Sequence, residues 1–178
     1  LYHWRCHEDS TAENPESKTY AFEAGKRAIE EHYKRTGINA EVLQGEFLGL
    51  YRTRFIRDHD PLISIIIPNK DHIADLKRCM DSIDKKSTYQ NYEYIIVENN
   101  STEEETFQYY KKLEAENPKA HVVYWDREFN YSAINNYGAT FAKGEYILLL
   151  NNDTEIINED CLEQLLGYCM RSRSEERR

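Results

Sequence analysis

The sequence predicts an α/β protein in which a mostly parallel sheet carries helices on both faces, preceded by a small helix-plus-β-ribbon segment. Four short, strongly apolar stretches occur after residue 60, and an amphipathic helical pattern follows each of them. Successive stretches repeat at close to the ~30 residues of a strand–helix–strand unit. This alternation is typical of a mostly parallel sheet, because the connecting helices cover both of its faces.

Residues 1–60 are polar and charged, and we expect them to form a linker or adaptor rather than a core. Asn14-Pro15 is typical of a helix start, because proline suits the first helical position. Apolar residues then recur at helical spacing, at Phe22, Ile29 and Tyr33. Gly37 is expected to end this helix. An alternating pattern over residues 51–55 then predicts a half-exposed strand of a short ribbon.

Residues 61–178 contain the regular part of the pattern. Strands are expected where β-branched and aliphatic residues cluster, at residues 62–67, 94–97, 121–125 and 146–150. Ser101 and Glu104 have the spacing of a capping box, which predicts the start of the second helix of this part. Asn158 is expected to cap the last helix. Tyr109 and Tyr110 fall on helix faces, where packing is the expected role.

Polar residues follow all four predicted strands. They are Pro68-Asn69-Lys70-Asp71, Glu98-Asn99-Asn100-Ser101, Asp126-Arg127 and Asn151-Asn152-Asp153. Any one of these sequences alone would be read as an ordinary turn or helix cap. In an open parallel sheet, however, ligands bind beyond the carboxyl ends of the strands. Four such sequences at one edge therefore predict a functional site there.

The residue types at this edge limit the chemistry. There is no G-x-G-x-x-G after the first strand, no P-loop and no G-x-S-x-G elbow. Carboxylate oxygens suit a hard divalent ion such as Mg²⁺ or Mn²⁺. Such an ion would neutralise a bound diphosphate, and Asp153 is well placed to hold it. The carboxylate of Glu98 would accept a hydrogen bond from the N–H of a nucleotide base.

Composition excludes other classes of function. A net charge of −9 and a pI of about 5.2 argue against nucleic-acid binding, because no basic surplus is available for phosphates. No run of 18 apolar residues is present, so we expect no transmembrane segment. The 4 cysteines lack C-x-x-C spacing, which favours a reducing compartment. We therefore expect a cytoplasmic location, with the inner membrane face as one option.

Several short motifs occur together in a specific order. They are Ile63-Ser-Ile-Ile-Ile-Pro68, Tyr92-Glu-Tyr-Ile-Ile-Val-Glu-Asn-Asn-Ser101, Asn136-Tyr-Gly-Ala139, Lys143-Gly-Glu-Tyr-Ile147 and Asn151-Asn-Asp153. Their order and spacing resemble glycosyltransferase family 2, whose members are inverting enzymes with the GT-A fold. The resemblance covers about residues 61–170.

The resemblance implies a donor site for a nucleotide sugar, often UDP- or TDP-linked. The loop that packs on the base corresponds to Pro68, Asn69, Lys70 and Asp71. Glu98 corresponds to an acidic residue that contacts uracil or thymine, and Asn152 corresponds to a position near the ribose. Asp153 is the last member of a D-x-D-like metal motif that would hold Mg²⁺ or Mn²⁺. Asn136 corresponds to an asparagine that helps to shape the donor pocket.

The sequence departs from the family pattern at three places. The usual Asp-Asp after the second strand is Glu98-Asn99, and the usual arginine before the pocket asparagine is Asn135. The metal motif is Asn-Asn-Asp, with a single acid at Asp153. A lone carboxylate would bind metal weakly until the donor diphosphate adds its oxygens.

The family resemblance further implies a hexosyltransferase acting in bacterial cell-surface polysaccharide synthesis. Its acceptor would be a glycan or a lipid-linked hydroxyl compound. The general base of the family comes from the following half of the domain, so we expect it beyond Arg178. The opening residues, Leu1-Tyr-His-Trp-Arg5, are similar to a stretch joining two tandem transferase domains. We therefore expect residues 61–178 to be a truncated nucleotide-sugar-binding part with little or no activity by itself.

Two alternative functions stay open from the sequence. The first is a non-catalytic nucleotide-sugar-binding or scaffolding domain, which is favoured by a metal motif with only one acid. The second is a nucleotidyltransferase, which ranks lowest because the loop after the first strand contains no glycine. Asp126 and Glu155 are weak candidates for a base within the chain.

Overall fold

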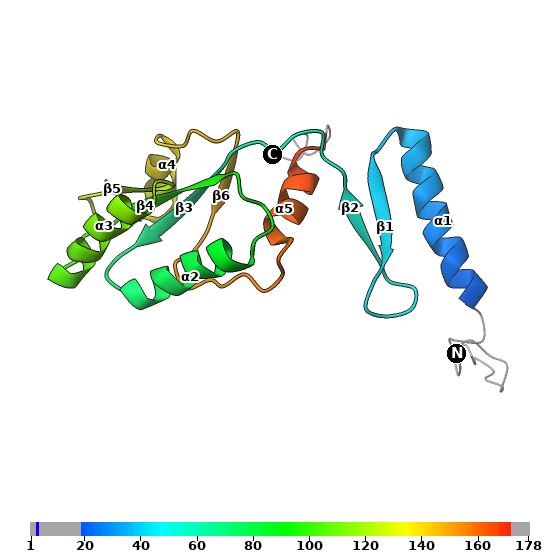
Figure 1. The fold of residues 1–178 in the computed structure, drawn as a ribbon, viewed down its shortest axis with the longest axis horizontal. Helices are drawn as coiled ribbons and strands as arrows, with labels where there is room; N and C mark the ends of the chain where they lie inside the picture. Colours follow the sequence, from blue (N-terminus) through cyan, green and yellow to red (C-terminus); the bar gives the residue numbers. More distant parts are fainter. Residues whose placement is uncertain (1–2, 4–18, 172–178) are drawn as a thin grey trace. The chain divides into compact units, whose positions relative to one another are not determined.

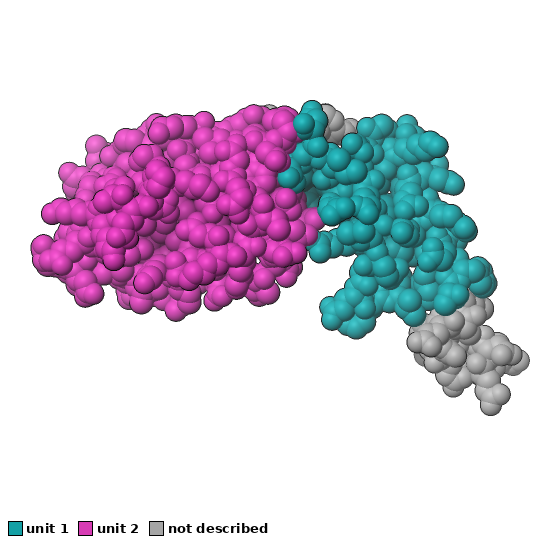
Figure 2. Space-filling view, in the orientation of Figure 1, with its two compact units in different colours: residues 1–58, 167–178 teal, residues 59–166 magenta. Residues whose placement is uncertain are grey.

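A computed structural model describes residue 3 and residues 19–171 (Figure 1). The expected helix start at Asn14-Pro15 lies outside the described residues. The chain divides into two compact units, one of residues 59–166 and one of residues 1–58 with 167–178 (Figure 2). The division into functional parts 1–60 and 61–178 stays a prediction, since a compact unit is not by itself evidence of a separate domain function.

The first unit contains a helix and a two-stranded ribbon. Helix α1 spans Thr19–Thr36, and strands β1, Ala40–Gln44, and β2, Tyr51–Phe55, pair antiparallel. Gly37 follows the helix with a φ of 69°, the left-handed conformation in which glycine commonly ends helices. The Tyr51 hydroxyl donates to the Phe22 carbonyl at 2.6 Å, which ties the ribbon to the helix.

The second unit contains a four-stranded, all-parallel sheet, which confirms the predicted fold class. Its strands are β3, Ile63–Asn69, β4, Tyr92–Glu98, β5, Ala120–Tyr124, and β6, Tyr146–Leu149. They are arranged in the order β5-β4-β3-β6. The register pairs Asn69 with Glu98, so two of the predicted site residues end adjacent strands side by side.

The connecting helices are α2, Ile73–Lys86, α3, Glu104–Glu116, and α4, Tyr131–Ala139; α5, Cys161–Cys169, follows the last strand. The predicted capping box is wrong, because α3 begins at Glu104 and the Ser101 side chain bonds to Glu98 instead. Asn158 is likewise not the cap of α5, which begins three residues later, at Cys161. Helix ends set by contacts with distant elements are not visible in local spacing.

Two glycines of the sequence motifs allow close packing in this unit. A Cβ on Gly138 of α4 would lie 2.6 Å from Ile66 Cγ2 and 2.8 Å from Val97 Cγ2, both in the buried core. A Cβ on Gly144 would lie 2.6 Å from the Leu62 carbonyl oxygen. Both glycines let backbone approach the sheet where no side chain fits.

Strand β6 forms one edge of the sheet. It is strongly apolar in sequence, yet Ile147 and Leu149 are 49% and 47% exposed. Successive side chains of a strand point to opposite faces, so Ile147 and Leu149 lie on one face of β6, and that face is only partly covered. Within residues 19–171, no helix is both long and apolar enough to cross a membrane.

Candidate functional site

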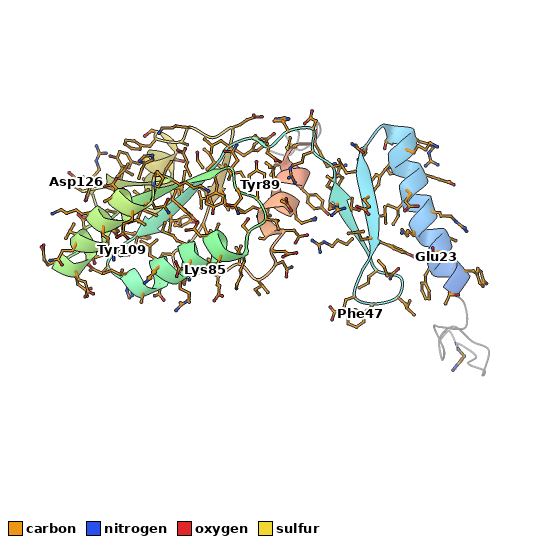
Figure 3. The ribbon with its side chains drawn as sticks, in the orientation of Figure 1. Glu23, Phe47, Lys85, Tyr89, Tyr109 and Asp126 are labelled. Atoms are coloured by element: carbon orange, nitrogen blue, oxygen red, sulfur yellow. The ribbon has the colours of Figure 1, made fainter. Side chains whose placement is uncertain are left out.

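The carboxyl ends of β3, β4 and β6 bring several predicted residues together. Asn69 and Glu98 are the last residues of neighbouring strands, and Asn151–Asp153 follow β6 on the other side of β3. Asp126 follows β5, which is the outer strand beside β4 (Figure 3). The topology therefore places the four polar sequences at one edge of the sheet, as a parallel sheet requires.

The Glu98 carboxylate is buried and held by three donors. Only 3% of the residue is exposed. One carboxylate oxygen accepts from the Ser101 N–H, and the other accepts from the Ser101 hydroxyl at 2.6 Å and the Tyr110 hydroxyl at 2.8 Å. A carboxylate has about four acceptor positions, so one is left on Oε1 for another partner.

Tyr110 of α3 belongs to the site, although the sequence indicated only packing for it. The side chain is 1% exposed, and its hydroxyl lies between Glu98 and Asn69. Burial first, and then the Glu98 carboxylate, raise the pKa of Tyr110 above its usual value. The hydroxyl therefore stays protonated and donates to Glu98. No local motif identifies such a residue, because its partners are 12 and 41 positions away.

Asn69 links β3 to the loop after β6. Its Nδ2 donates to the Tyr110 hydroxyl at 2.8 Å and to the Asp71 carbonyl at 2.7 Å. Its Oδ1 accepts from Asn152 Nδ2 at 2.7 Å. The buried Asn69 amide thus joins two other residues predicted for the site, Asp71 and Asn152.

Asp71 holds the segment that leads into α3. It has a φ of 51°, and its carboxylate accepts from the backbone N–H groups of Thr102 and Glu103, each at 3.1 Å, and from the Thr106 hydroxyl at 3.2 Å. Desolvation opposes ionisation, but the hydrogen bonds from Glu103, Thr102 and Thr106 together lower the pKa of Asp71 below its usual value. A negative charge at a helix N-terminus is favourable. Contact of Asp71 with a nucleotide stays a prediction.

The remaining loop residues differ in exposure. Pro68 is half-buried, whereas Lys70 is exposed beyond the strand end. On α4, Asn136 is exposed while its neighbour Asn135 is buried. Asn135 Nδ2 donates to the Tyr131 carbonyl, and within the described part of the chain its buried Oδ1 has no partner. Buried polar atoms are normally satisfied, so Asn135 Oδ1 is open to a water or a ligand atom.

Asp153 is the acidic residue that the sequence predicts for a metal. Its side chain is exposed. Burial of the Cys79 thiol, and secondly the nearby negative charge of Asp153, raise the pKa of that thiol to about 11. No group of three His, Cys, Asp or Glu side chains suited to a metal occurs within residues 19–171. One carboxylate is enough for Mg²⁺ when substrate phosphates supply further oxygens. The residues therefore fit a metal that binds together with the donor, not a preformed metal centre.

The loop after Asp153 is fixed to α2. Lys86 Nζ donates to a Glu155 carboxylate oxygen at 2.8 Å and to the Ile156 carbonyl at 2.9 Å. The Lys86 hydrogen bond and charge lower the pKa of Glu155. A lowered pKa makes this carboxylate a weaker proton acceptor, which argues against Glu155 as a general base.

Comparison with known proteins identifies the family. The profile described as Glycosyl transferase family 2 matches residues 64–174, which is more than half of the chain. The chain belongs to this family. The match includes β4, β5, β6 and all of β3 except its first residue, Ile63.

Two relatives match nearly the whole chain. Protein y4gI of Sinorhizobium fredii is 38% identical over 172 residues, covering 96% of this chain and 19% of its own length. The O-antigen biosynthesis protein RfbC of Myxococcus xanthus is 37% identical over 171 residues, covering 96% of this chain and 13% of its own length. The chain thus spans less than a fifth of either of these relatives. Both alignments extend well beyond the family match at residues 64–174, which means that they include the helix and ribbon of the first unit.

A solved structure shares the fold. The mannosyltransferase PcManGT of Pyrobaculum calidifontis, in complex with GDP-Man and Mn²⁺, aligns with a TM-score of 0.57 and 16% identity. The alignment covers 86% of this chain and 42% of that one. At this identity the likeness concerns the fold, which agrees with the GT-A architecture expected from the sequence.

Proposed function

We propose that this chain is the nucleotide-sugar-binding part of a longer glycosyltransferase that makes bacterial cell-surface polysaccharide in the cytoplasm. The parent enzyme would transfer a hexose from a nucleoside-diphosphate sugar to a hydroxyl of a glycan or lipid-linked acceptor, with inversion. The observation that carries the proposal is the cluster of Asn69, Glu98 and Asn152 beside Asp153, at the carboxyl edge of a family 2 domain.

The cluster has the chemistry that a nucleotide requires. A carboxylate and amides offer hydrogen-bond acceptors and donors for the base and the ribose. Recognition of the base and the ribose through these groups does not require a basic loop. The relative RfbC is an O-antigen biosynthesis protein, which supports polysaccharide synthesis as the pathway. PcManGT binds GDP-Man, which supports a nucleotide sugar as the donor class.

A divalent ion on Asp153 would neutralise the charge of the leaving diphosphate. PcManGT contains Mn²⁺, which supports Mg²⁺ or Mn²⁺ here. The chain's own contribution is to orient the donor: Glu98 and Asn152 would hold the nucleoside, and Asp153 would fix the diphosphate end. We expect the base that deprotonates the acceptor to lie outside this chain; the pairing of Glu155 with Lys86 argues against Glu155, and Asp126 stays a weak candidate.

The experiment that tests this proposal is a calorimetric titration of the folded chain with UDP, TDP and GDP, with and without Mn²⁺. We expect Mn²⁺-dependent binding of at least one nucleotide and its loss in Asp153→Ala. Glu116→Ala is the matched control, since it removes an exposed carboxylate from the end of α3. Absence of binding by a chain that circular dichroism shows to be folded would refute donor binding, and equal loss in both variants would refute the role of Asp153.

A non-catalytic nucleotide-sugar-binding or scaffolding domain is the second candidate. The single acid of the Asn-Asn-Asp motif favours it, together with the use of the Asn152 amide in a bond to Asn69. Sugar transfer by the longer protein that contains this chain separates the two functions. Transfer that disappears in Asp153→Ala supports the enzyme, and transfer that is unaffected supports the scaffold.

A further inference from the structure

A continuous chain of hydrogen bonds runs beneath the candidate site. Tyr110 donates to Glu98 Oε2 at 2.8 Å, and Asn69 Nδ2 donates to the Tyr110 hydroxyl at 2.8 Å. Asn152 Nδ2 donates to Asn69 Oδ1 at 2.7 Å. Three of the four side chains are almost completely buried, and Asn152 at the end is half-buried. The series of hydrogen bonds therefore begins in the core and ends at the surface of the site.

The direction of these bonds is fixed from the buried end. An ionised carboxylate only accepts, so the single hydroxyl proton of Tyr110 must point to Glu98. The Tyr110 oxygen is then an acceptor, and Asn69 must turn its NH₂ group toward it. The Asp71 carbonyl, a pure acceptor 2.7 Å from the same NH₂ group, requires the same orientation. The hydrogen-bond network thus assigns the amide orientation, as it must for any asparagine.

The fixed direction decides which atom Asn152 offers to a ligand. Because Asn69 presents Oδ1, Asn152 must present Nδ2 to it, and Asn152 Oδ1, which has no hydrogen bond within residues 19–171, is left as an acceptor. A free acceptor suits a hydroxyl donor and is unfavourable for a phosphate oxygen. Besides the N–H groups of its base, a nucleoside diphosphate offers the two ribose hydroxyls as donors.

We propose that Tyr110 is a positioning residue that acts through Asn69 to turn the carbonyl oxygen of Asn152 toward a ribose hydroxyl of the donor. This inference rests on the proposed function, since it assigns a role within the same site. Tyr110 itself touches no ligand. Its removal would leave one Asn69 N–H without an acceptor and the Asp71 carbonyl as the remaining group that orients the Asn69 amide, so the Asn69 and Asn152 amides would rotate more readily.

The test compares the affinity for UDP with that for 2′,3′-dideoxy-UDP, both with Mn²⁺, by calorimetry. The unmodified chain should prefer UDP, and Tyr110→Phe should reduce that preference about threefold to tenfold, the worth of one net hydrogen bond. Asn152→Ala should reduce it similarly, and the double variant no further than Asn152→Ala alone. Tyr109→Phe, on the same helix, is the control and should keep the preference (Figure 3).

A purely structural role for Tyr110 would lower the melting temperature and weaken both ligands equally, leaving the preference unchanged, and that result would overturn the inference. Additive losses in the double variant would overturn it as well. If Tyr110→Phe does not fold, Asn69→Ala takes its place in this test, because it interrupts the same series of hydrogen bonds.

A ligand-free measurement separates this inference from the proposed function. In ¹⁵N-labelled chain, the Asn152 side-chain NH₂ protons should exchange slowly with water in the unmodified chain and in Tyr109→Phe, and faster in Tyr110→Phe. Equal exchange in all three would overturn the orienting role of Tyr110. Protected protons in a chain that binds no nucleotide would uphold the orienting role and refute the proposed donor site.

Discussion

Gly138→Ala tests whether the close approach of α4 to the sheet limits the stability of the second unit. The added Cβ would lie 2.6 Å from Ile66 Cγ2 and 2.8 Å from Val97 Cγ2. Both neighbours are β-branched and completely buried, so neither can move to another rotamer without disturbing the core. The helix must therefore shift outward or the strands must bend.

The expected magnitude is the difference of two effects. Overpacking a buried site costs about 1–3 kcal/mol, and rigid neighbours favour the upper half of that range. Alanine is about 1 kcal/mol better than glycine within a helix, which offsets part of the cost. We therefore expect a net loss of about 1–2 kcal/mol in the free energy of unfolding.

Urea unfolding followed by circular dichroism measures this loss, and Ser132→Ala is the control because it lies on the same helix but is exposed. Adding Val97→Ala removes one of the two colliding methyl groups, so the double variant should lose about 1 kcal/mol less than the sum of the single variants. A Gly138→Ala chain as stable as Ser132→Ala would refute the packing argument, and so would strict additivity with Val97→Ala.

Two further predictions concern titratable groups. Burial, and then the nearby Asp153 charge, raise the pKa of Cys79 to about 11. Iodoacetamide at pH 8 should therefore alkylate the exposed Cys169 well before Cys79, as measured by peptide mass spectrometry. Equal alkylation rates of the two cysteines in the folded protein would contradict this prediction. Burial also raises the pKa values of Tyr92, Tyr94 and Tyr110, the first two also through Asp84. A raised folded-state pKa means that the stabilisation is complete below the unfolded value near 10 and is lost as the pH rises above it. Absorbance at 295 nm should therefore show tyrosines that ionise only when the chain unfolds, and full ionisation of all tyrosines in folded chain near pH 10 would refute the burial argument.

Local sequence patterns were sufficient for the sheet because each buried strand is a short β-branched run and each helix has its own apolar spacing. The β6 run shows the limit of that reasoning. Its composition matches a strand buried on both faces, but β6 is the outer strand and the face that carries Ile147 and Leu149 is half exposed. Strand order depends on which crossovers are made, and the pattern within a strand does not record it.

The start of α3 was predicted wrongly for a related reason. Ser101 has the right spacing for a capping box, but Asp71, 30 residues earlier, supplies the carboxylate that accepts from the backbone N–H groups of Thr102 and Glu103, directly before the helix. Ser101 is then available to Glu98. A long-range acceptor that is charged outcompetes a local hydroxyl, because a hydrogen bond to a charged group is stronger.

The sequence by itself determined the parallel sheet, the family, and the edge at which Asn69, Glu98 and Asn152 gather, since these follow from periodicity and from residues adjacent in the chain. Only the tertiary structure decided how the three are connected. Tyr110 joins Glu98 to Asn69, and Asn69 joins Asn152, through hydrogen bonds between elements distant in sequence. The physical reason is that a buried polar group must find a partner wherever the fold provides one, and the direction of each bond then limits the next.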